Sequence, residues 1–280
     1  MTTNCATIIT QAEKGRAFRA LHEGAGAFII PNPWDVGTAR ILAHLGFKAL
    51  ATTSMGYAFS VGRCDYTVNR EEALAYASDV ASATSLPVSA DLQNGYGDSP
   101  EIVAETVRLA ATAGVVGCSI EDATGRADHP IYEREYAIER VRAGAAAAHK
   151  LPFPFILTAR AENYLYGRPN LEDTIERLQA YQEAGADVLY APGLATREEI
   201  SAVVTSLDRP VNVLIGLGGA QLSLAELAAI GVRRVSVGSA LCRTALGALL
   251  RAAREMQERG TFTFAGEAAS SREISAIFKT

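Results

Sequence analysis

The sequence alternates eight short apolar runs with longer stretches of helical periodicity, and this alternation restricts the fold more than any other feature. The runs, each predicted to be a strand, cover residues 27–30, 48–53, 87–91, 115–121, 154–160, 186–191, 211–215 and 234–238. Amphipathic stretches long enough to form covering helices lie at 70–84, 100–113, 133–149, 170–184 and 240–259. Apolar strands that alternate with helices are typical of a parallel sheet buried on both faces. Eight such units favour an α/β fold of the closed (β/α)8 TIM-barrel type over an open doubly wound sheet.

Glycines and the first turn support this interpretation. A glycine shortly before a strand can end the preceding helix in the left-handed conformation; the four candidates are Gly46, Gly114, Gly185 and Gly231. A dinucleotide-binding fold would need Gly-x-Gly-x-x-Gly after the first strand, where the chain reads PNPWD over 31–35. We therefore predict one barrel domain over residues 1–280, with 1–12 and about 261–280 as peripheral segments.

Composition excludes several classes of protein. The 280 residues carry a net charge of −5 and no dense run of Lys and Arg, which argues against a nucleic-acid partner. No apolar stretch reaches the roughly 18 uncharged residues that a membrane helix needs, and the charged N-terminal segment does not resemble a secretory signal. Four cysteines without Cys-x-x-Cys spacing argue against disulfides and structural zinc. We expect a reduced, cytoplasmic protein with no membrane partner.

Acidic side chains follow three neighbouring strands of the predicted barrel. Asp91 ends the third strand, Glu121 ends the fourth, and Asp65 lies in the loop after the second. Because active sites of such barrels lie at the carboxyl ends of the strands, these carboxylates should converge on one mouth. Oxygen ligands of this kind suit Mg²⁺, which usually keeps several waters. The alternative role for Asp91 and Asp98 is to cap the N-terminus of a helix.

Other strand-end residues narrow the chemistry. None of the four lysines lies at the carboxyl end of a predicted strand, which argues against a Schiff-base aldolase. His129 is the one histidine in a loop of the catalytic face, where it is either an acid–base residue or an exposed loop residue. Arg160 ends the fifth strand and can bind a carboxylate or phosphate with two hydrogen bonds. Its alternative is a structural ion pair with Glu162 or Glu121.

These segments together resemble the isocitrate lyase and phosphoenolpyruvate mutase superfamily. The matching segments are NPWD (32–35), TSMG (53–56) with Asp65, ADLQNGYG (90–97), SIED (119–122), TAR (158–160) and VNV (211–213). The Ala-Asp-x-x-x-Gly-Tyr-Gly pattern of 90–97 is the most specific. The resemblance implies a barrel whose last helix is often swapped onto a neighbouring subunit, and hence a homodimer or homotetramer. It also implies Mg²⁺ and a small 2-oxo or 2-hydroxy carboxylate as ligands.

The resemblance assigns roles residue by residue. Asp91 would contact the metal directly or through water, while Asp65 and Glu121 would hold metal-bound waters. Backbone N–H groups around Ser54 to Gly56 would cradle the substrate, and Arg160 with Asn212 would bind its carboxylate oxygens. The candidate metal ligands are Asp91, Asp65, Glu121 and Gln93. The candidate substrate-binding residues are Trp34, Ser54, Met55, Gly56, Asp91, Arg160, Asn212 and Tyr190.

The sequence departs from the family pattern at two places. Gln93 stands where members commonly have a second acidic residue. The loop over 123–130 reads ATGRADHP and lacks both the cysteine and the lysines that the lyases carry there. A divergent subgroup is therefore predicted, in which the acid or base comes from other residues. The candidate catalytic residues are Arg160, His129, Glu162 and Tyr96, with Asp128, Arg126 and Tyr190 as further possibilities.

The predicted function is that of a Mg²⁺-dependent carbon–carbon lyase. Its substrate would be a small 2-hydroxy or 2-oxo carboxylate, and its intermediate a metal-stabilised enolate. The alternatives within the enzymes are an oxaloacetate-type decarboxylase or hydrolase and a phosphonopyruvate-type phosphoryl transfer enzyme. The alternative outside the enzymes is a barrel that binds a 2-oxo acid without catalysis.

Overall fold

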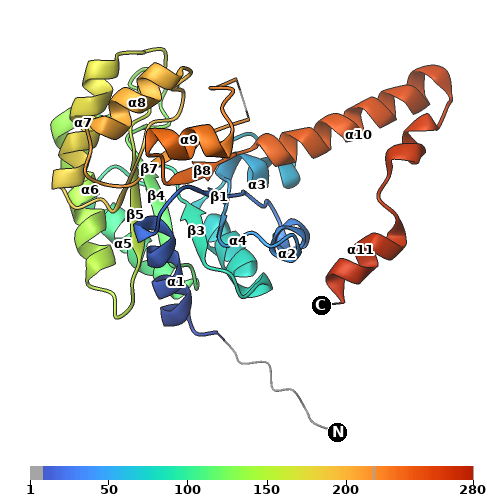
Figure 1. Cartoon of the computed structure of the whole chain (residues 1–280), viewed down its shortest axis with the longest axis horizontal. Coiled ribbons are helices and arrows are strands. Elements are labelled where there is room, and N and C mark those ends of the chain that lie inside the picture. The colour runs from blue at the N-terminus through green and yellow to red at the C-terminus, as the bar shows by residue number, and fades with distance from the viewer. Residues whose placement is uncertain (1–8, 217, 280) are drawn as a thin grey trace, which may run out of the picture.

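The computed structural model describes residues 9–216 and 218–279, and its eight strands form a parallel sheet that curves into a nearly closed barrel (Figure 1). The strands pair in the order β1-β8-β7-β6-β5-β4-β3-β2, so that the first and last units are neighbours. The remaining seam lies between β1 and β2, where the Ala51 N–H donates to the Pro31 carbonyl at 3.1 Å. The strands are β1 (Phe28–Ile30), β2 (Leu50–Ala51), β3 (Val88–Asp91), β4 (Gly117–Glu121), β5 (Ile156–Arg160), β6 (Val188–Tyr190), β7 (Val211–Leu214) and β8 (Arg234–Ser236).

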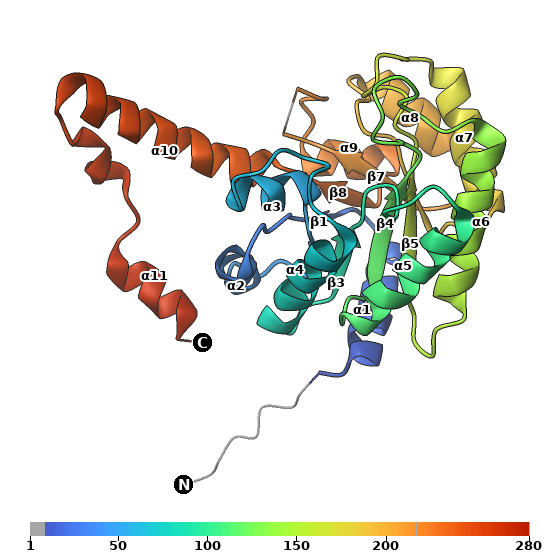
Figure 2. The same cartoon turned by 180° about the vertical axis from the view of Figure 1, so that it is seen from behind.

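Helices cover the outside of this barrel, and the predicted (β/α)8 TIM barrel is confirmed (Figures 1 and 2). The helices are α1 (Gln11–Glu23), α2 (Val36–His44), α3 (Ser54–Ser60), α4 (Arg70–Ala83), α5 (Pro100–Thr112), α6 (Arg134–His149), α7 (Leu171–Glu183), α8 (Arg197–Thr205), α9 (Leu224–Ile230), α10 (Ala240–Arg259) and α11 (Ser271–Phe278), with a 3₁₀ turn η1 (Thr263–Glu267). Each of the eight predicted strands contains an observed strand, usually shorter by a few residues. The five predicted helices agree with α4, α5, α6, α7 and α10 to within a residue.

Local sequence signals account for many of these helix ends. Five helices begin with a capping box, in which the N-cap and N3 residues exchange hydrogen bonds; their N-caps are Thr10, Asp35, Asn69, Thr196 and Ser223. The four glycines singled out before strands all have positive φ, between 86° and 103°. They end helices in the left-handed conformation, as predicted.

The amino-terminal end of the barrel is closed by α1. Phe18 is fully buried there and packs with Ile30, Ile156 and Val188 from three strands and with Val116, which precedes β4. Gly117 lets β4 pass close to this helix, because a side chain at that position would come within 2.9 Å of the Phe18 ring. Because α1 closes this end of the barrel, a ligand has to enter at the opposite end, where the strands have their carboxyl ends.

The chain after β8 forms an arm that projects from the barrel. Helix α10 extends away from the body, and η1 and α11 follow, with α11 returning to contact α2 (Figures 1 and 2). Large apolar side chains on the arm are exposed, among them Leu249, Leu250 and Phe262. No described residue of α11 is buried. The first eight residues of the predicted peripheral segment 1–12 lie outside the described part of the chain. Among the described helices, none is both long and apolar enough to cross a bilayer.

Candidate active site

A cavity of about 440 Å³ opens at the carboxyl ends of the strands. Its wall contains Asp65, Asp91, Glu121, Arg160 and Glu162, all of which were singled out from the sequence. A second cavity of about 50 Å³ lies inside the barrel. Because Asp91 and Arg160 line both cavities, the small one is the inner continuation of the large one.

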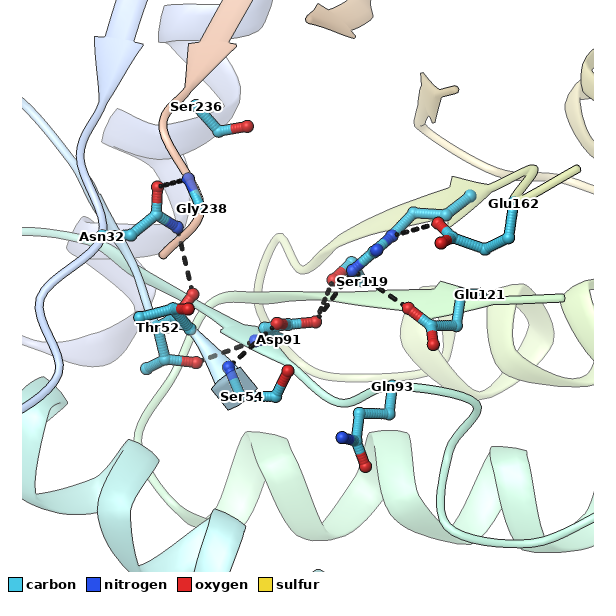
Figure 3. Close-up of polar contacts among 12 residues, drawn as sticks. Asn32, Thr52, Ser54, Asp91, Gln93, Ser119, Glu121, Glu162, Ser236 and Gly238 are labelled. Atoms are coloured by element: carbon cyan, nitrogen blue, oxygen red, sulfur yellow. Dashed lines mark hydrogen bonds and ion pairs between the residues drawn. The ribbon is translucent and has the colours of Figure 1, made fainter. Parts of the chain in front are cut away.

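The Arg160 guanidinium sits at the centre of the acidic residues. Its Nη1 lies 3.1 Å from Asp91 Oδ1 and 3.0 Å from Glu121 Oε2, and its Nε lies 2.8 Å from Glu162 Oε1. Figure 3 shows the three carboxylates converging from β3, β4 and the end of β5. Arg160 therefore makes both ion pairs that were its structural alternative, and one more with Asp91. Its Nη2 has no hydrogen-bond partner among the described residues, so one edge of the fork remains open to a ligand.

Burial shapes the protonation of this cluster. Burial raises the pKa of Glu121 and of Glu162, and the positive charge of Arg160 opposes the rise in both. The same carboxylates raise the pKa of Arg160 above its usual value against the effect of burial. Arg160 therefore stays charged, while Glu121 and Glu162 hold protons more readily than exposed glutamates do.

Asp91 is fixed by hydrogen bonds to residues at or near the ends of neighbouring strands. The Ser54 N–H donates to its Oδ2 at 3.0 Å and the Ser119 hydroxyl to its Oδ1 at 3.3 Å, while its own N–H donates to Thr52 Oγ1 at 2.8 Å (Figure 3). The alternative role as a helix cap is not observed for Asp91 or Asp98, since Ser99 caps α5. The carboxylate of Asp91 is thus held in one orientation at the mouth.

Asp65 and Gln93 form a second polar group beside Asp91. The Gln93 side-chain amide donates to Asp65 Oδ1 at 3.0 Å. Burial and the charge of Asp91 raise the pKa of Asp65, which shows that two like charges face each other across this part of the site. Gln93 adopts a φ of +49°, uncommon outside glycine, and this turn directs its amide to Asp65.

Tyr66 is a residue of the site that the sequence did not reveal. Its hydroxyl donates a hydrogen bond to Glu121 Oε1, and the Tyr166 hydroxyl donates to the Tyr66 oxygen at 3.4 Å. Burial and the Glu121 charge raise the pKa of Tyr66 far above its usual value. The single available signal was its position next to Asp65. Arg243, on the first turns of α10, also lines the mouth and has no ion pair within the described residues.

Asn32 joins both sides of the barrel seam. Its Oδ1 accepts hydrogen bonds from the N–H groups of Val237 (3.0 Å) and Gly238 (2.9 Å), and its amide donates to the Thr52 carbonyl at 3.1 Å (Figure 3). The side chain is buried. It fixes the loop after β8 against the ends of β1 and β2, and so holds that wall of the cavity.

The predicted site residues divide into two groups. Those that line a cavity are Ser54, Met55, Asp65, Asp91, Glu121, Arg160, Glu162, Tyr190 and Asn212. Those that line neither cavity are Trp34, Gly56, Gln93, Tyr96 and His129. Of the N–H groups predicted to cradle a substrate, that of Ser54 donates to Asp91 and that of Gly56 to the Thr53 hydroxyl at 3.2 Å.

Two candidate acid–base residues, His129 and Tyr96, line neither cavity. An antiparallel β-bridge joins Ala123 to Ile131, and His129 is exposed on the loop between them, outside the cavity wall. Tyr96 packs against the apolar cluster that contains Ala58 and Val68. Burial raises the pKa of Tyr96 far above its usual value, and the charges of the nearby carboxylates raise it further.

Metal binding at this mouth has to rely on few protein ligands. Among the described residues, no three His, Cys, Asp or Glu side chains are grouped closely enough to hold an ion by themselves. Mg²⁺ is commonly bound through one or two carboxylates and keeps several waters. Asp91 and Asp65, with their facing charges and the amide of Gln93, fit that mode of binding.

Residues 18–257 match the profile of the phosphoenolpyruvate phosphomutase family. The chain belongs to this family. The match covers the barrel and most of α10, which confirms the resemblance found in the sequence. A Burkholderia cenocepacia J2315 protein provisionally assigned as a lyase/mutase is 61% identical, with a TM-score of 0.94 over 96% of this chain and 97% of that one.

Two further relatives of this phosphoenolpyruvate phosphomutase family member act on oxaloacetate. The oxaloacetate decarboxylase of Pseudomonas aeruginosa PAO1 is 30% identical over 251 residues, which are 87% of this chain and 84% of the enzyme. An oxaloacetate acetylhydrolase solved with its product oxalate is 26% identical, with a TM-score of 0.85 over 96% of this chain and 94% of that one. These two relatives are thus enzymes of a small 2-oxo diacid.

Proposed function

We propose that the protein is a Mg²⁺-dependent carbon–carbon lyase that acts on a small 2-oxo diacid of the oxaloacetate type. The observation that carries this proposal is the buried cluster of three carboxylates around Arg160 at the barrel mouth, beside Asp65 and Gln93. The relatives that act on oxaloacetate support the choice of substrate class. The proposal unites the predicted lyase with its decarboxylase alternative, because loss of CO₂ from oxaloacetate breaks a carbon–carbon bond.

The metal would be held mainly by Asp91, with Asp65 and Glu121 binding waters in its coordination sphere. Bound Mg²⁺ would supply Lewis-acid stabilisation of the negative charge that develops on the 2-oxo group when the bond breaks. The facing charges of Asp65 and Asp91 favour a cation between them. Gln93 would add a neutral ligand in place of an acidic one, so we expect weaker Mg²⁺ binding than a third carboxylate would give.

The side chains of this chain would orient the substrate and handle its proton. The open Nη2 edge of Arg160 can bind a carboxylate of the acid, while its other nitrogens hold the three acidic residues in place. Loss of CO₂ leaves the bonding electron pair on the 2-oxo product as an enolate, and C3 then needs one proton. Burial raises the pKa of Glu121 and of Glu162, so the mouth contains carboxyl groups that can carry the proton for C3.

The test is turnover of oxaloacetate with Mg²⁺, corrected for the reaction that Mg²⁺ promotes without protein. Pyruvate and CO₂ as products identify a decarboxylase, whereas oxalate and acetate identify a hydrolase. We expect Asp91→Asn to lose at least a hundredfold in kcat/KM. The matched control is Asp98→Asn, because Asp98 is an exposed aspartate that pairs with Arg126 and lines neither cavity.

Three results would contradict the proposal: no metal-dependent turnover by the wild type, equal losses in both variants, or no loss in Asp91→Asn. Solvent deuterium exchange at C3 of pyruvate provides a second readout. Exchange that depends on Asp91 would identify an enzyme, and binding of pyruvate without exchange would favour the binding-protein alternative.

We also propose that the arm joins subunits into a homodimer or homotetramer. Leu249, Leu250, Met256 and Phe262 are exposed on the arm, each by more than 40%. Apolar side chains grouped in this way on a projecting helix usually mark a surface that another chain covers. A helix exchanged between subunits would cover them.

A further inference from the structure

Arg234 is a buried arginine at the inner end of the site. It belongs to β8, is 5% exposed, and lines the 50 Å³ cavity inside the barrel together with Asn212 and Ser236. Its Nε donates to Asn212 Oδ1 at 2.8 Å, and its Nη1 is buried without any hydrogen-bond partner. An arginine N–H buried without an acceptor costs free energy and is rare in folded proteins.

The charge of Arg234 has no counterpart. Arg160 meets three carboxylates, whereas no acidic side chain in the described part of the chain forms an ion pair with Arg234. Burial and the charge of Arg160 lower the pKa of Arg234 to about 10, so the guanidinium remains charged at neutral pH. A buried charge without a partner is strongly unfavourable. An anion in the cavity would offset this cost.

The neighbours of Arg234 present further donors. Arg234 Nε donates to Asn212 Oδ1, and this hydrogen bond fixes the orientation of the Asn212 side-chain amide. The Nδ2 of the same amide donates to Ser236 Oγ at 2.9 Å. The cavity, of about 50 Å³, is large enough for one carboxylate group. Thr53, Tyr190 and Gly238 line both the inner cavity and the mouth, so a ligand can span the two.

We propose that Arg234 forms the cationic floor of an interior subsite that takes one carboxylate of the substrate. This rests on the proposed function, since it places the second carboxylate of a diacid whose reacting carbons lie at Asp91 and Arg160. Diacids are therefore preferred over 2-oxo acids with a single carboxylate. No bond is made or broken at the subsite.

The test uses sodium formate, the smallest carboxylate, with EDTA present and no metal. Thermal unfolding is followed during a formate titration for the wild type, Arg234→Gln, Arg234→Lys and Arg233→Gln. Arg233 is the matched control, because it is the neighbouring arginine and donates to the Gly26 carbonyl at 3.2 Å outside the cavity. Saturating formate should raise the Tm of the wild type and of Arg233→Gln by about 2–4 °C. Arg234→Lys should keep part of this shift and Arg234→Gln none.

The subsite is overturned if the wild type shows no shift, or if Arg234→Gln responds as the wild type does. If Arg234→Gln fails to fold, Arg234→Lys provides the test. The role of the guanidinium would be overturned if formate raised the Tm of Arg234→Lys as much as that of Arg233→Gln and half-saturated it at a concentration within twofold of the wild-type value. These formate titrations need neither turnover nor metal, so they test the subsite even if oxaloacetate is not the substrate. With turnover established, formate should compete with oxaloacetate, and Arg234→Gln should raise KM at least tenfold. Formate that binds without competing would overturn the assignment to a substrate carboxylate.

Discussion

The buried histidine at the closed end of the barrel gives a quantitative prediction of pH-dependent stability. His22 is 5% exposed, its Nδ1 lies 2.8 Å from the Phe18 carbonyl oxygen, and its Nε2 is buried without a hydrogen-bond partner. Its ring also makes edge contacts with Phe18 and Phe28. Burial, together with the positive charge of Arg234, lowers the pKa of His22 to about 3.

The sign of the effect follows from proton binding. The unfolded chain binds a proton at this histidine below a pKa of about 6.5, whereas the folded protein does not until the pH approaches 3. The free energy of unfolding should therefore fall as the pH is lowered from 7.5. Between pH 7.5 and 5.5 the loss from this one group is about 1.4 kcal/mol. For a chain of this length, that corresponds to a Tm lower by about 3–6 °C.

The assay compares urea unfolding of the wild type, His22→Gln and His129→Gln at the two pH values. His129 is the matched control because it is an exposed histidine on a loop. The difference between wild type and His22→Gln should shrink by about 1.4 kcal/mol at pH 5.5, while His129→Gln should follow the wild type. Parallel pH dependences of wild type and His22→Gln would refute the reasoning, since the folded protein would then protonate His22 as readily as the unfolded chain.

Three further predictions concern the cluster, the packing and the arm. Arg160→Met leaves buried carboxylates unpaired and should lower the free energy of unfolding, measured with urea, by about 3–5 kcal/mol at pH 7.5. The loss should be smaller at pH 5.5, where these carboxylates accept protons. An equal loss at both pH values would contradict this. Gly15→Ala should lower the free energy of unfolding by about 1–3 kcal/mol, because the added Cβ would lie 2.4 Å from the Pro154 carbonyl oxygen. Gly247→Ala, whose nearest neighbour is a flexible side-chain end at 3.4 Å, should instead be neutral or stabilising, and a loss equal to that of Gly15→Ala would rule out the packing argument. Deletion of 261–280 should reduce the number of subunits per particle, obtained from the mass measured by light scattering, and an unchanged number of subunits would exclude this part of the arm from subunit contacts.

The sequence was a good guide to the elements and to the acidic residues at the strand ends. The βα alternation and the glycines before strands are local signals, and they predicted the barrel because each unit follows from its own few residues. Asp91 and Glu121 could be placed at one mouth because parallel strands end at the same side. The position of Arg160 followed in the same way, although its alternative roles could not be separated without the distances to its partners.

Other parts of the site depend on contacts between distant residues. Tyr66 meets Glu121 across 55 residues of sequence, and nothing in either neighbourhood signals the contact. The interior cavity depends on the inward side of β8, where a one-residue shift would exchange Arg234 with Arg233. His129 was placed on the catalytic face correctly as a loop residue, but the turn of that loop decides whether its ring reaches the cavity. Such features arise from packing and not from local propensity.

The hydrogen bonds of Asn32 also determine when the site can form. They join residues up to 206 positions apart, so the seam cannot close before Gly238 has been made. At a synthesis rate of about 5–20 residues per second, roughly 10–40 s separate these two residues on the ribosome. During that interval β1 and β2 have exposed edges, which are prone to pairing with other chains. We therefore expect this protein to complete its catalytic end late and to depend on chaperones more than a chain of equal size with local contacts.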